Sequence, residues 1–181
     1  EPVAAAFRIH EQLNVKHDDR VIVLGDGKLG LLCAQVMRLK SNHVQCIGKH
    51  ADKLKTLDGL GIEILTLIDT VEPNADIVVE ATGSAEGLKR ALQLVRPEGT
   101  VVLKTTVAHE TALDFSLPVI NEVRIVGSRC GPFPPALDAL ANGAVRVTPM
   151  IHATYALDDA AAALEHAQRP SVLKVLLNIS A

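Results

Sequence analysis

The chain has 181 residues, a formal net charge of −3, and 48% hydrophobic but only 2% aromatic residues. This mildly acidic balance argues against a nucleic-acid or anionic-membrane partner, because both bind basic surfaces, and no apolar run reaches the roughly 20 residues that a membrane-spanning helix needs. With so few aromatic residues, the core must consist of Val, Ile, Leu and Ala, as in parallel sheets with helices on both faces.

The first residues predict a helix and indicate that the chain is part of a longer protein. The sequence begins with Glu1 and Pro2 instead of Met, and apolar residues follow at helical spacing over residues 4–13. We expect a fragment, or one domain of a larger protein. A processed or disordered N-terminus is the alternative.

Short apolar runs then alternate with amphipathic stretches. Strands are predicted at residues 20–24, 44–47, 62–67, 76–81, 100–104 and 123–127. Helices are predicted at residues 29–39, 51–60, 84–95 and 134–141, and a loop at residues 107–118. The alternation predicts a doubly wound, parallel six-stranded α/β sheet of the Rossmann type, with strand order 3-2-1-4-5-6.

The end of the chain does not fit that count. After residue 150 the pattern predicts a strand, a helix at residues 160–167 and a last strand at residues 172–179. We therefore expect a dinucleotide-binding domain at residues 1–149 and a C-terminal segment at residues 150–181 that belongs to a neighbouring domain.

The strongest chemical signal is a glycine loop after the first predicted strand. It has the pattern G-x-G-x-x-G, made by Gly25, Asp26, Gly27, Lys28, Leu29 and Gly30. Gly25 permits a tight turn, Gly27 lets a pyrophosphate approach the backbone, and Gly30 lets the next helix pack close to the strand. The N–H groups that begin this helix then face the phosphates. The pattern predicts a dinucleotide site; a turn used only for packing is the alternative.

The end of the second predicted strand indicates which dinucleotide binds. An NAD site usually has Asp or Glu there to bind the ribose hydroxyls, whereas Gly48 takes that position here and leaves space. Lys49 and His50 follow, and Lys53 lies one turn further on. A lysine would hold the 2′-phosphate of NADP, which a carboxylate would repel. We expect NADP(H) over NAD(H); a solvated helix start is the alternative interpretation.

Together with the glycine loop, further motifs resemble the cofactor-binding part of the zinc-type medium-chain dehydrogenase/reductase family, which includes alcohol and polyol dehydrogenases. They are Glu1-Pro2, DIVVEATGS at residues 76–84, RPEGTVV at residues 96–102, VGSRCG at residues 126–131 and LKVL at residues 173–176. The resemblance covers almost the whole chain. It implies a catalytic domain whose first part precedes this chain and whose last part is residues 150–181.

The resemblance also implies which residues contact the cofactor. They lie at the ends of predicted strands, where ligands bind in doubly wound sheets. They are Ala81, Thr82 and Gly83 beside the riboses, Leu103, Lys104 and Thr105 along the nicotinamide, and Val126 and Ser128 against the ring. Lys104 departs from the small residue often found at its position. A plain turn and helix cap is the alternative for Thr82 and Gly83.

In polyol-type members similar to this chain, a Cys and a His-Glu pair from the preceding part hold a catalytic zinc, and the Glu of a Glu-Pro pair supplies a further ligand. Glu1 matches that Glu. A zinc site needs about three protein ligands, so the resemblance implies zinc in the full-length enzyme and not in this chain alone. A solvated terminal carboxylate is the alternative for Glu1.

The resemblance implies hydride transfer between NADP(H) and a small alcohol or carbonyl substrate, with this chain inactive by itself. A zinc-independent NADPH reductase of the same broad family is one alternative. A non-catalytic, nucleotide-sensing Rossmann module is another.

Two expectations concern the whole molecule. Family members often pair through the sixth strand, so residues 123–126 are a candidate edge for a homodimer. Cys33, Cys46 and Cys130 form no CxxC motif and no even-numbered framework, which predicts free thiols in a reducing, cytoplasmic compartment.

Overall fold

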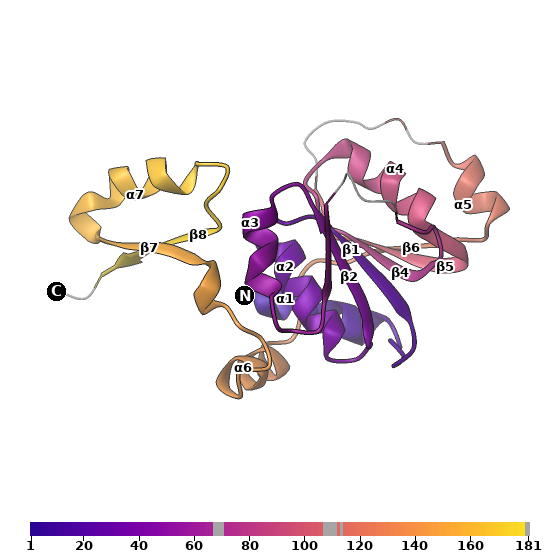
Figure 1. The fold of residues 1–181 in the computed structure, drawn as a ribbon, viewed down its shortest axis with the longest axis horizontal. Coiled ribbons are helices and arrows are strands. Elements are labelled where there is room, and N and C mark those ends of the chain that lie inside the picture. Colours follow the sequence, from indigo (N-terminus) through magenta and orange to yellow (C-terminus); the bar gives the residue numbers. More distant parts are fainter. Residues whose placement is uncertain (67–70, 107–111, 113, 180–181) are drawn as a thin grey trace.

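The structure is a computed structural model that describes residues 1–66, 71–106, 112 and 114–179. Six parallel strands form one sheet in the order β3-β2-β1-β4-β5-β6, as the sequence predicts (Figure 1). The order reverses between β1 and β4, and in such sheets ligands bind at this switch point, beyond the carboxyl ends of the strands. The strands are β1 (Arg20–Leu24), β2 (His43–Gly48), β3 (Glu63–Thr66), β4 (Ala75–Glu80), β5 (Val95–Leu103) and β6 (Arg124–Gly127).

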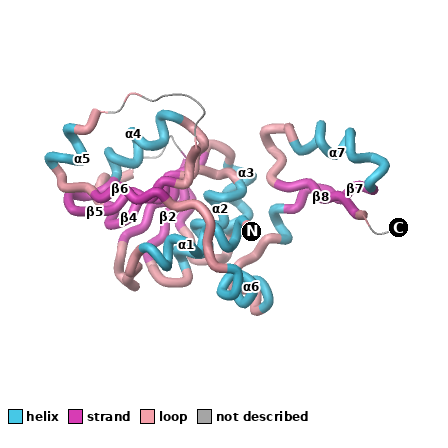
Figure 2. Tube along the Cα trace, turned by 180° about the vertical axis from the view of Figure 1, so that it is seen from behind, coloured by secondary structure: helices cyan, strands magenta, loops and turns pink. Residues whose placement is uncertain are grey.

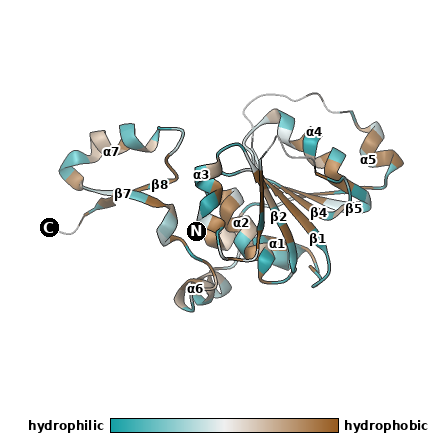
Figure 3. Cartoon of the chain, viewed as in Figure 1, coloured by the Kyte–Doolittle hydropathy of each residue, from teal (hydrophilic) through white to brown (hydrophobic). Residues whose placement is uncertain are grey.

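Helices cover both faces of this sheet. Val21 and Val23 of β1 share one core cluster with α1 and α2, whereas Ile22 and Leu24 share the other with α4. Successive strand residues point to opposite faces, so a strand buried on both sides is apolar throughout, and Figure 3 shows the central strands largely in brown. The helices are α1 (Pro2–Gln12), α2 (Lys28–Arg38), α3 (Ala51–Leu54), α4 (Ala85–Leu94), α5 (Ser116–Ile120), α6 (Phe133–Ala141) and α7 (Ala160–Ala167).

The helix after β2 is shorter than its sequence pattern predicts. The pattern extends over residues 51–60, but α3 ends at Leu54 and a 3₁₀ turn follows at Lys55–Leu57. Gly59 and Gly61 have φ angles of 73° and 69°. These left-handed conformations cannot continue a right-handed helix, which explains the early end.

The fifth strand is longer than predicted. It begins at Val95 instead of residue 100 because Val95 already pairs with Ala75 of β4. The register then shifts between Ala75 and Ile77, and Glu98 adopts a φ of 59°. The predicted loop after this strand contains α5 at its end; residues 107–111 and 113 of that prediction lie outside the described residues.

The C-terminal residues form a separate small unit. The strands β7 (Ile151–Ala156) and β8 (Lys174–Asn178) pair in parallel, with α7 between them in sequence. Figure 2 shows this unit beside the six-stranded sheet and not within it. Its assignment to a catalytic domain, with a boundary at residue 150, stays a prediction.

Among the described residues, no helix combines the length and hydrophobicity that crossing a membrane requires.

Candidate functional site

The glycine loop makes a turn that tolerates no side chain at two of its glycines. Gly25 has a φ of 119°, and a Cβ there would lie 2.5 Å from the carbonyl oxygen of Ala81. A Cβ on Gly30 would lie 2.0 Å from the carbonyl oxygen of Gly25. Both contacts are too short for any side chain. Gly30 therefore lets α2 pack directly against the end of β1, and Gly25 lets the loop lie against the residues that follow β4.

Gly27 differs from the other two glycines because its free side faces open space. A Cβ built on Gly27 meets nothing within 4 Å. Gly27 is also the N-cap residue of α2, and no side chain in the described part of the chain caps that helix. The first N–H groups of α2 are therefore available to an anion, which the helix dipole also favours. This geometry fits the diphosphate of a dinucleotide.

A cleft of about 1090 Å³ opens beside this helix start and runs along the ends of β4, β5 and β6. Its lining is mostly apolar, as expected for a cofactor site. It brings together eleven residues that the sequence analysis singled out: Glu1, Gly27, Lys28, Leu29, Ala81, Thr82, Gly83, Leu103, Lys104, Thr105 and Ser128.

The other predicted residues do not line this cleft. Gly25 lies in the turn after β1, Gly30 is buried in the first turn of α2, and Val126 is half-buried in β6. A second group, next to the end of β2, consists of Asp26, Gly48, Lys49, His50 and Lys53. In a doubly wound sheet the adenosine ribose lies beside the end of β2, so this group matches the other half of a dinucleotide.

The space beside Gly48 is not open, contrary to the sequence analysis. A Cβ on Gly48 would lie 2.4 Å from the Cβ of Asp26. The Asp26 carboxylate is buried there, and its Oδ2 accepts hydrogen bonds from the backbone N–H and the Nδ1 of His50, at 2.5 and 2.9 Å. The chain folds this way because Gly48 has no side chain to displace Asp26. Lys49 is exposed and Lys53 half-buried.

Glu80 is a buried carboxylate that the sequence analysis did not single out. Its Oε1 accepts hydrogen bonds from the Thr82 backbone N–H at 2.8 Å, the Thr82 hydroxyl at 2.6 Å and the Thr105 hydroxyl at 2.9 Å. Gly87 leaves room for it, since a Cβ there would lie 2.3 Å from Oε1. The signal was a Glu that directly follows the apolar run Ile77–Val79 of β4.

Lys104 also lines the cleft, but its ammonium group is bound to the protein. Nζ donates to the carbonyl oxygen of Ala5 at 2.5 Å and to the Ser128 hydroxyl at 2.8 Å. Burial lowers the pKa of Lys104 below its ordinary value. Lys104 therefore joins β5 to α1 and to the end of β6, and it holds Ser128 in position at the cleft.

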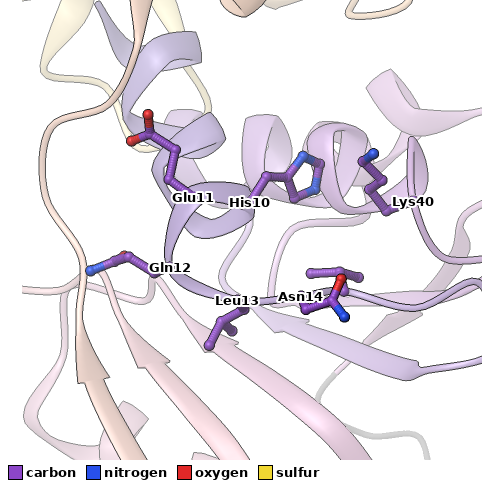
Figure 4. A pocket seen from close by; sticks show the side chains of 7 residues that line it. His10, Glu11, Gln12, Leu13, Asn14 and Lys40 are labelled. Atoms are coloured by element: carbon purple, nitrogen blue, oxygen red, sulfur yellow. The ribbon is translucent and has the colours of Figure 1, made fainter.

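A second, smaller pocket of about 280 Å³ lies at the far end of α1 (Figure 4). In this view His10 points toward Lys40. His10 Nε2 and Gln12 Oε1 are buried without hydrogen-bond partners among the described residues. Burial, with a smaller effect of Lys40, lowers the pKa of His10 to about 4.

Among the described residues, no three His, Cys, Asp or Glu side chains gather closely enough to hold a metal ion. The described residues by themselves therefore do not provide the ligands that the expected zinc ion needs. Glu1 lines the cleft next to Lys104, and its role as a zinc ligand stays a prediction.

Known proteins are similar to this chain in sequence and in fold. A family model described as "Glucose dehydrogenase C-terminus" matches residues 4–179. The sequence is 26% identical to a sorbitol dehydrogenase of Halalkalibacterium halodurans and 25% identical to D-xylulose reductase A of Aspergillus oryzae, each over 98% of this chain. These matches cover 57% and 55% of the two relatives, so the chain spans little more than half their length.

Among solved structures, a protein of Sinorhizobium meliloti described as a zinc-binding dehydrogenase bound to NADP superposes with a TM-score of 0.89 at 25% identity. The match covers 99% of this chain and 58% of that protein.

Proposed function

Because the chain belongs to the glucose dehydrogenase C-terminus family, we propose that it is the nicotinamide-cofactor-binding part of an alcohol or polyol dehydrogenase. The intact enzyme transfers hydride between NADP(H) and a small alcohol or carbonyl compound, and this chain alone binds cofactor without turnover. The single observation that carries the proposal is the start of α2, where Gly27 and free N–H groups meet the cleft.

The chain's own residues prepare this site for a cofactor. A bound nicotinamide supplies the hydride donor or acceptor. Glu80 fixes the hydroxyls of Thr82 and Thr105 at the ends of β4 and β5, and Lys104 fixes Ser128 at the end of β6. The mostly apolar lining of the cleft suits the face on which the ring and a small substrate would meet.

The preference for NADP rests on Lys49. This lysine is exposed directly after Gly48, and β2 itself supplies no carboxylate. A 2′-phosphate carries nearly two negative charges, so an adjacent ammonium group favours NADP over NAD.

The test is calorimetric titration of the chain with NADP and with NAD. We expect the chain to bind NADP more tightly, and Lys49→Ala to weaken NADP by about tenfold while leaving NAD within about twofold. The matched control is Lys16→Ala, because Lys16 is an exposed lysine in the segment between α1 and β1. Tighter binding of NAD by the unmodified chain would contradict the cofactor preference.

We also propose that zinc acts in the intact enzyme, with Glu1 as one ligand. Glu1 borders the cleft, but a zinc site needs about three protein ligands, so the remainder must come from outside the described residues. When bound, zinc polarises the oxygen of an alcohol or carbonyl substrate.

The edge of the sheet supports a homodimer. β6 is the last strand of the sheet, and its Ile125 is exposed. In the neighbouring α5, Val119 and Ile120 are 73% and 75% exposed. An end strand next to exposed apolar side chains can pair with its counterpart on a second copy, so we propose that two copies associate through β6.

The thiols support a reducing, cytoplasmic location, which we also propose. All three cysteines are free, with Cys33 and Cys46 buried and Cys130 exposed. Burial raises the pKa of Cys33 to about 12 and that of Cys46 even further. Free thiols persist in compartments that keep cysteine reduced.

A further inference from the structure

Asp26 occupies the place from which a side chain on Gly48 would extend. A Cβ on Gly48 would lie 2.7 Å from Oδ2 of Asp26 and 2.8 Å from its Cγ. Dinucleotide sites that prefer NAD usually have a carboxylate on the residue that ends β2. Here a carboxylate reaches that place from the glycine loop instead.

The two oxygens of this carboxylate have different surroundings. Oδ2 accepts both hydrogen bonds from His50. Oδ1 has no hydrogen-bond partner among the described residues. Among the described residues, the fully buried side-chain atoms without a hydrogen-bond partner are His10 Nε2 and Gln12 Oε1. Oδ1 of Asp26 is not among them, so it is not fully buried. Oδ1 therefore keeps some exposure to solvent, although the Asp26 side chain as a whole is only 12% exposed, and the two bonds from His50 hold this oxygen in a fixed direction.

We propose that Asp26 is a specificity-determining residue, whose Oδ1 accepts a hydroxyl of the adenosine ribose and thereby lets the site bind NAD as well as NADP. This inference rests on the proposed cofactor-binding function. A carboxylate accepts hydroxyl hydrogen bonds strongly and repels a 2′-phosphate, whereas Lys49 attracts one. The cofactor preference is then the balance between the fixed negative charge of Asp26 and the exposed positive charge of Lys49.

The first experiment compares NAD and NADP affinities of the chain and of Asp26→Asn by calorimetric titration. Asn keeps the size of the side chain and can still accept a hydrogen bond from His50, but it carries no charge. We expect the ratio of the NAD to the NADP dissociation constant to rise by about tenfold. Partial unfolding of the variant lowers the stoichiometry of both titrations alike and leaves this ratio intact.

The second experiment moves the carboxylate from the loop to the strand. Asp26→Gly removes both the Cβ and the carboxylate that a side chain at position 48 would meet. The double variant Asp26→Gly with Gly48→Asp therefore restores a carboxylate near the same place. We expect it to bind NAD about tenfold more tightly than Asp26→Gly alone.

The matched control is Asp52→Asn, which removes one negative charge from an exposed carboxylate at the start of α3. We expect it to leave the ratio within about twofold, because exposed charges are screened by solvent and salt. An unchanged ratio in Asp26→Asn, or an equal change in Asp52→Asn, overturns the inference. If the unmodified chain prefers NAD but the ratio still rises in Asp26→Asn, the role of Asp26 stands and the proposed NADP preference fails. If the unmodified chain binds neither cofactor, both fail.

Discussion

The hydroxyl of Thr105 lies 2.9 Å from Oε1 of Glu80 and joins the ends of β4 and β5. The same hydroxyl oxygen accepts a hydrogen bond from the backbone N–H of Gly83 at 3.0 Å. The Thr105 hydroxyl therefore donates to Glu80 and accepts from Gly83, and both bonds join the end of β5 to the end of β4. The edge of the cleft at Thr82 and Gly83 is therefore held by contacts from the next strand.

Thr105→Val tests this connection. Valine keeps the shape of threonine but leaves Glu80 with one bond fewer and the Gly83 N–H without its acceptor. We expect the free energy of unfolding to fall by about 1–3 kcal/mol, measured by urea denaturation, and the affinity for NADP to fall by about fivefold. Thr105→Ser retains the hydroxyl and serves as control; equal effects of Val and Ser would contradict this role.

Replacing either of two loop glycines by alanine should affect a different property: stability for Gly30 and cofactor affinity for Gly27. A Cβ on Gly30 would lie 2.0 Å from a backbone oxygen, whereas a Cβ on Gly27 meets nothing within 4 Å. We expect Gly30→Ala to lower the unfolding free energy by about 2 kcal/mol or more. Gly27→Ala should change it by less than about 1 kcal/mol but weaken NADP by about tenfold, because the methyl group stands where the diphosphate approaches. A stable Gly27→Ala variant with unchanged NADP affinity would show that the diphosphate lies elsewhere.

Lys104→Met should destabilise the contact between α1 and the sheet. Methionine fills most of the space but leaves the Ala5 carbonyl and the Ser128 hydroxyl without their donor. We expect a loss of about 1–3 kcal/mol in the free energy of unfolding, followed by circular dichroism in urea. Lys89→Met, at an exposed lysine of α4, is the control. Equal stability of the two variants would mean that Lys104 contributes no net stabilisation.

The buried His10 should make the chain sensitive to acid. Its folded-state pKa of about 4 lies below the ordinary histidine value of 6.5. Between these values the unfolded chain binds a proton that the folded chain does not, so stability rises with pH through this window and is lost as pH falls. We expect His10→Gln to reduce the difference in unfolding free energy between pH 7 and pH 5 by about 1–2 kcal/mol. An identical pH dependence in both proteins would mean that His10 does not contribute.

The features that were predictable from the sequence are those that depend on local patterns of residues. The individual strands and helices and the turn at Gly25, Gly27 and Gly30 were predictable because they depend on residues close together in the chain. The order of the strands followed from the Rossmann topology that this alternation indicates. The predicted helix at residues 51–60 was too long because the left-handed conformations of Gly59 and Gly61 cannot belong to a helix.

Contacts between distant residues were not visible in the sequence. Asp26 occupies the space beside Gly48 only because the loop folds over the end of β2. Lys104 reaches Ala5 across almost a hundred positions of sequence. The sequence therefore predicted a cofactor site at the glycine loop, but it did not reveal that the Asp26 carboxylate lies beside Gly48.

The most direct test of the cofactor site is a crystal structure of the chain grown with a saturating concentration of NADP. We expect the diphosphate oxygens to accept hydrogen bonds from backbone N–H groups at the start of α2, next to Gly27, with the nicotinamide in the cleft beside Thr105. A cofactor bound at another surface, or a cleft that stays empty at saturation, would contradict this account.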